Sequence, residues 1–80
     1  MMRQIIVEQK VIPSIETYWG IKLTKENVLD PPIIRCILRT PYVGKAIFIK
    51  ILFHFGFVVT KYNGIVPLEN LKPHQTLETT

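Results

Sequence analysis

The stretch AIFIKILFHFGFVV, residues 46–59, decides how this chain folds. Eleven of its fourteen residues are apolar, and the exceptions are Lys50, His54 and Gly56. A chain of 80 residues builds one small core. The stretch is therefore either the centre of that core or a surface that a partner covers. It is shorter than the roughly 18–20 residues of a membrane-spanning helix, so membrane association is only a minor alternative.

Two secondary structures compete for this stretch. A helix over residues 41–55 would begin at Thr40-Pro41, a hydroxyl cap followed by proline, and would end at Gly56. A strand would place the odd-numbered residues 47–59 on one face and Lys50 with His54 on the other. A thirteen-residue strand would be unusually long, and a glycine weakens a strand interior. The Thr40-Pro41 pair and Gly56 therefore favour the helix.

The residues before this stretch predict a strand and a further helix. Residues 4–12 are rich in β-branched side chains and predict a first strand. After Pro13, a short turn of helix capped by Ser14 would end at Gly20. Asp30 followed by two prolines is typical of a helix start, and apolar residues recur behind it at helical spacing, so we expect a helix over residues 31–39.

The residues after the apolar stretch predict a β-hairpin. Residues 57–62 and 65–68 are strand-like, and Asn63-Gly64 between them is typical of a two-residue type I′ turn. Pro67 restricts the second strand to a sheet edge. Residues 69–80 are polar and predict a partly mobile tail.

Together these elements predict a single α+β domain over residues 1–68. It would contain an N-terminal strand, two helices and a C-terminal hairpin, with a mostly β small barrel as the alternative. The predicted core consists of apolar residues from every element: Ile5, Val7, Ile33, Ile37, Ile47, Ile51, Phe55, Phe57 and Val59.

The charge distribution is more informative than the net charge of +4. No acid occurs between Asp30 and Glu69, whereas five cations do. A positive zone of this kind attracts phosphates, nucleic acid or anionic lipid, although scattered cations also serve simply to solvate a hydrophobic domain. The single cysteine, Cys36, favours a reducing compartment over the disulfide-rich secreted class, and we expect a cytoplasmic protein.

No catalytic or metal-binding motif accompanies this charge. No cysteine or carboxylate lies at ligand spacing from His54 or His74, and the four glycines are too far apart for a phosphate loop. Residues 43–77 are similar to the HicA-type RNA-cleaving toxins, but residues 61–64 read Lys-Tyr-Asn-Gly where that family has a catalytic histidine. We therefore expect a non-catalytic chain that needs no metal or cofactor.

The order helix, proline turn, helix and hairpin over residues 31–68 resembles a winged helix-turn-helix. The resemblance implies that the second helix enters the major groove and that the hairpin touches the backbone. That helix is too hydrophobic for base readout, so we expect general phosphate contact. The candidate nucleic-acid-binding residues are Arg35, Arg39, Lys45, Lys50, His54, Lys61 and Asn63.

The apolar excess supports a different function equally directly. With 48% apolar and only 20% charged residues, the chain could be a protein–protein adaptor or subunit whose apolar surface is covered by a partner or by a second copy.

Overall fold

The structure is a computed structural model, and it describes residues 6–70. It is a small α+β domain with three α-helices and a two-stranded antiparallel sheet. The alternative of a mostly β barrel is wrong for this part of the chain. In order, the elements are η1 (Val7–Val11, a π-helix), α2 (Ile12–Trp19), α3 (Pro31–Arg39), α4 (Lys45–His54), β1 (Phe57–Thr60), β2 (Gly64–Pro67) and η2 (Leu68–Asn70, a 3-10 helix).

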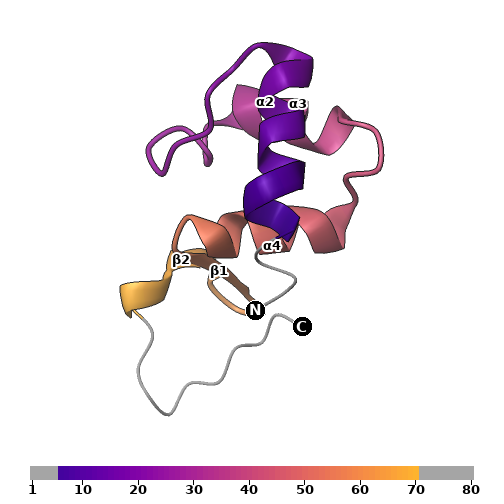
Figure 1. Cartoon of the computed structure of the whole chain (residues 1–80). Coiled ribbons are helices and arrows are strands. Elements are labelled where there is room, and N and C mark those ends of the chain that lie inside the picture. Colours follow the sequence, from indigo (N-terminus) through magenta and orange to yellow (C-terminus); the bar gives the residue numbers. More distant parts are fainter. Residues whose placement is uncertain (1–5, 71–80) are drawn as a thin grey trace.

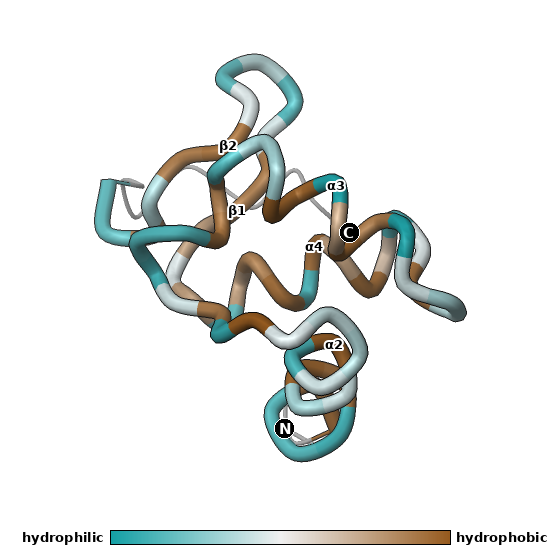
Figure 2. The backbone as a smooth tube through the Cα atoms, turned by 90° about the horizontal axis from the view of Figure 1, so that it is seen from above, coloured by the Kyte–Doolittle hydropathy of each residue, from teal (hydrophilic) through white to brown (hydrophobic). Residues whose placement is uncertain are grey.

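Helix α4, from the apolar stretch, is the centre of the fold. It contacts η1, α3 and β1. Figure 1 shows it lying between the N-terminal helix and the hairpin, and in Figure 2 its mostly hydrophobic tube runs among the other elements. Gly56, with φ of 93°, lies in the left-handed region just after the helix, as its position in the sequence predicted. The helical interpretation of this stretch is therefore confirmed over residues 45–54.

The predicted N-terminal strand is wrong, because residues 7–19 form one continuous helical segment. Pro13 has no N–H to donate, and in a regular α-helix its ring would collide with the carbonyl of Gln9. The π-helical turn widens the helix immediately before that point. Val7 and Ile15, eight residues apart on one side of this segment, are both buried in the core. The free energy gained from burying them exceeds the intrinsic preference of these residues for a strand.

Helix α3 forms as predicted, and prolines define both of its ends. Asp30 and Thr40 have ψ near 130° because the residue before a proline is driven out of the helical region. The predicted carboxylate cap is absent, since the Asp30 side chain makes no capping hydrogen bond. Its main-chain carbonyl instead accepts from the N–H of Ile34 at 2.8 Å.

The second helix starts later than expected. Thr40 ends α3 instead of capping α4, and α4 begins at Lys45 with Gly44 as its N-cap. The connection between the two helices requires a left-handed residue, Tyr42, with φ of 69°. This conformation costs a non-glycine residue about 1–2 kcal/mol. The wrong boundary arose because a Thr-Pro pair terminates a helix as readily as it starts one.

The hairpin is present, but its turn differs from the predicted one. Thr60 pairs with Gly64, so the loop has three residues, 61–63, instead of two. A type I′ turn would need a positive φ at Asn63 as well as at Gly64, and only Gly64 has one. The Thr60 side chain stabilises the longer loop, since its Oγ1 donates to the Gly64 carbonyl at 3.0 Å and accepts from the N–H of Asn63 at 2.9 Å.

The predicted core is largely confirmed. Val7, Ile37, Ile51 and Phe57 are buried. Four others are partly buried and pack against this cluster: Ile33, Ile47, Phe55 and Val59. Ile5 and residues 71–80 of the predicted tail lie outside the described residues. The prediction missed six buried residues: Ile12, Ile15, Leu23, Val28, Leu52 and Val58.

Two of the missed residues lie in the connection before α3, which side-chain hydrogen bonds hold against the core. The Leu23 N–H donates to Oε2 of Glu16 at 2.8 Å. Thr24 and Asn27 bond reciprocally, each side-chain oxygen accepting from the other's main-chain N–H, at 2.8 and 3.1 Å. This reciprocal arrangement is that of a capping box. It fixes a polar-looking segment so that its apolar neighbours can be buried.

One buried hydroxyl joins the N-terminal helix to the end of α3. Thr40, 8% exposed, accepts from Nε1 of Trp19 at 2.6 Å and donates to the Cys36 carbonyl at 2.8 Å. We expect Thr40→Val to destabilise the domain by about 1–3 kcal/mol, because the indole N–H loses its acceptor. Urea unfolding followed by circular dichroism measures this loss. Thr40→Ser keeps the hydroxyl and should lose less; an equal loss in both variants would contradict the role given to this hydrogen bond.

Within residues 6–70, no helix has the length and hydrophobicity needed to cross a membrane.

Candidate nucleic-acid interface

Helix α3 presents two arginines to solvent. Arg35 and Arg39 are both exposed, and they are four residues apart on one side of the helix. Arg39 lies in the last turn, where a cation is stabilised by the helix dipole. Two guanidinium groups in this arrangement can bind neighbouring phosphates of a nucleic-acid backbone.

Helix α4 carries three of the candidate residues at different depths. Lys45 is its first residue and is exposed, whereas Lys50 and His54 are half-buried. The His54 ring packs edge-on against Phe55, with ring centroids 5.0 Å apart. Lys50 and His54 lie on the same side of the helix, as expected from their spacing. Lys45 lies about 140° around the helix from Lys50, so the two lysines do not share a face.

The hairpin loop carries the last two candidates. Lys61 and Asn63 are exposed in the three-residue loop between β1 and β2. The Lys61 ammonium lies 5.9 Å from the ring centroid of Tyr62, within reach of a cation–π interaction. The Asn63 N–H donates to the Thr60 hydroxyl, so the amide side chain of Asn63 takes no part in that hydrogen bond. The loop thus projects a cation, an aromatic ring and an amide together.

The candidates therefore form three groups on consecutive elements: the pair on α3, those on α4 and those on the loop. An apolar component of the outward side of α4 was not predicted from the sequence. Ala46 and Phe53 are exposed there and share that side with Lys50, at i, i+4 and i+7 spacing. The exposed apolar side could have been predicted from the sequence, because nearly all residues of this helix are hydrophobic. A helix in so small a domain cannot bury its whole circumference.

Across residues 6–70, no cluster of three or more His, Cys, Asp or Glu side chains could hold a metal ion. Comparisons with protein-family models, with curated proteins and with solved structures found no match.

Proposed function

We propose that this chain is a small, non-catalytic binding module of the winged-helix type. It would contact nucleic-acid phosphates through α3, the start of α4 and the hairpin loop. One observation carries this proposal: four of the five cations in the acid-free span are exposed, and they lie on successive elements, namely Arg35, Arg39, Lys45 and Lys61.

The order of the elements supports the same proposal. In a winged helix-turn-helix, two helices joined by a short connection are followed by a two-stranded wing. Here α3, the connection 40–44, α4 and the β1–β2 hairpin have that order. The hairpin loop with Lys61 would then be the part that touches the backbone beside the groove.

The surface chemistry favours phosphate contact over base recognition. The exposed side of α4 offers Ala46 and Phe53 next to Lys50, and it lacks the Asn, Gln or Arg side chains that read base edges. Binding should therefore depend little on sequence and strongly on ionic strength.

Fluorescence anisotropy with a labelled duplex DNA tests this proposal. If the four exposed cations each neutralise one phosphate, the logarithm of affinity should fall with the logarithm of salt at a slope of about −3.6. Affinity would then drop about 150-fold between 50 and 200 mM salt. A duplex RNA and a duplex of unrelated sequence should give similar slopes. Absence of binding to all of these at low salt would remove the proposal.

A second function, that of a protein–protein adaptor, is favoured by a different observation. Large apolar side chains are exposed on several elements, among them Leu38, Phe53 and Leu68. Surfaces of this kind mark protein interfaces when they are contiguous. Sedimentation of the purified chain separates the two functions. A monomer that shifts nucleic acid supports the first, and an obligate dimer that ignores nucleic acid supports the second.

A further inference from the structure

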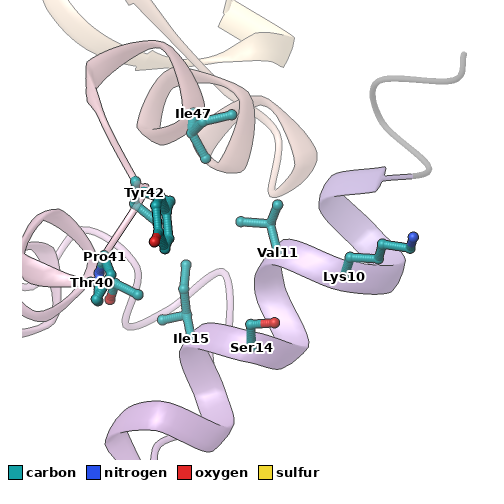
Figure 3. Close-up of a pocket in the computed structure, with 9 residues that line it drawn as sticks. Lys10, Val11, Ser14, Ile15, Thr40, Pro41, Tyr42 and Ile47 are labelled. Atoms are coloured by element: carbon teal, nitrogen blue, oxygen red, sulfur yellow. The ribbon is translucent and has the colours of Figure 1, made fainter.

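A pocket lies between the N-terminal helix and the connection from α3 to α4. Its volume is about 240 Å³. In Figure 3, Val11 and Ile15 point from the helix toward Tyr42 and Ile47 on the other side. Thr40 lines the same pocket, and its hydroxyl is already bonded to Trp19 and Cys36. The interior is therefore mostly apolar, without a free polar group from Thr40.

The residue at the mouth of this pocket is in an unusual state. Tyr42 is fully exposed, at 100%, yet its main chain is held in the left-handed region, with φ of 69°. Its ring gains nothing from burial in the folded chain to offset that conformation. Strained residues of this kind cluster at ligand-binding positions, where a bound group supplies the missing contacts. A ligand in the pocket would cover one side of the Tyr42 ring.

The polar groups of the pocket indicate which ligands fit. Lys10 is the one charged residue among those that line it, and its stem runs outward along the helix in Figure 3. Lys10 and Ser14 also border a shallower hollow on the same helix, so they form the rim shared by both. A flexible ammonium and a hydroxyl at the rim suit a carboxylate, and they disfavour a cation.

The π-helical turn contributes to this arrangement. Lys10 and Val11 both belong to η1, whose wider turn leads directly into α2. The volume is sufficient for a ring, because apolar cavities of about 150 Å³ bind benzene. A pocket of about 240 Å³ has room for one aromatic ring and a short acid group.

We propose that this pocket binds a single-ring aromatic carboxylate. The ring would lie between Tyr42, Val11 and Ile47, since Ile15 behind them is 0% exposed. The carboxylate would lie at the rim beside Ser14, and the flexible Lys10 side chain would turn toward it from its position in Figure 3. None of the cations proposed to bind phosphates lines this pocket, so the two proposals can be tested independently.

Titration of the full chain with phenylacetate tests the proposal, with the fluorescence of Trp19 as the readout. Trp19 is the sole tryptophan, and its hydrogen-bond partner Thr40 lines the pocket. We expect saturable binding with a dissociation constant of about 1 mM, as for a ligand of this size. Phenethylamine has the same ring with a cation, and acetate has the acid without the ring. Both should bind at least about tenfold more weakly.

Two variants connect the response to the pocket. Lys10→Gln should weaken phenylacetate by about threefold and leave benzyl alcohol unchanged, because only the charge contact is lost. Tyr42→Gly should weaken the binding of phenylacetate and of benzyl alcohol by about fivefold, because the contact with the Tyr42 ring is lost. The melting temperature should not fall, because glycine accepts the positive φ at this position. The proposal is overturned by a response that fails to saturate at about 20 mM, by equal responses to phenylacetate and acetate, or by unchanged affinities in both variants.

Discussion

We expect Leu52→Ala to unfold most of the protein or leave it only marginally stable. Leu52 is 0% exposed and lies on the side of α4 that packs into the core. Truncating a buried leucine to alanine costs about 2–5 kcal/mol, from lost burial and the cavity that remains. Proteins have about 0.05–0.15 kcal/mol of stability per residue, which gives about 4–12 kcal/mol for 80 residues. The substitution therefore removes a large share of the total.

The neighbouring residue supplies the control. Phe53 is 38% exposed on the outward side of α4, so Phe53→Ala should cost about 1 kcal/mol or less, although it deletes a larger side chain. A strand over the same residues would reverse the order, because alternation would bury Phe53 and expose Leu52. Urea unfolding of the two variants measures both costs. A larger loss for Phe53→Ala would contradict the helix and the packing described for it.

We expect the double variant Lys45→Gln/Lys61→Gln to lose about tenfold or more in affinity for duplex DNA at low salt. Both lysines are exposed, one at the start of α4 and one in the hairpin loop. Each neutral replacement removes one phosphate contact, so the salt slope should become shallower by about two. The loss should be similar for unrelated DNA sequences, because phosphate contacts carry no sequence information. Anisotropy titrations at several salt concentrations measure both quantities.

The matched control is Lys22→Gln/Lys25→Gln. These two lysines are also exposed, and they lie before α3, outside the acid-free span. The control removes the same charge from the same type of residue. If affinity depended only on net charge, both double variants would lose equally, and the proposed interface would be wrong. Circular dichroism of each variant establishes that the fold is retained.

The sequence predicted α3, the central helix and the hairpin because strong local signals mark them. Proline and glycine restrict the main chain directly, so Pro31 and Gly56 identify boundaries without knowledge of the tertiary structure. Thr40-Pro41 is ambiguous by the same physics, because a residue before proline leaves the helical region whether a helix ends or begins there. That ambiguity accounts for the late start of α4.

Only the end of the N-terminal helix, after Pro13 and closed by Gly20, was predicted, because two signals conflict in residues 4–19. β-Branched residues favour a strand by composition, and Pro13 suggested a break. The opposing signal was a four-residue apolar spacing, Val7, Val11, Ile15 and Trp19, which places these residues on one helical face. For the candidate site, charge predicted exposure at four of the five cations. The sequence could not show the pocket, because its walls come from segments about thirty residues apart.

The packing of the N-terminal helix on α4 has a consequence for how the chain folds. The α3–α4 and α4–β1 contacts and the hairpin join neighbours in sequence, and such local contacts form quickly. The contact between η1 and α4 is different, because the chain from Ile12 to Gly44 must close as a loop before it forms. The chain loses the conformational entropy of this loop before the burial of Val7 and Ile51 stabilises the contact. Docking of the N-terminal helix therefore carries the largest entropic barrier among these contacts.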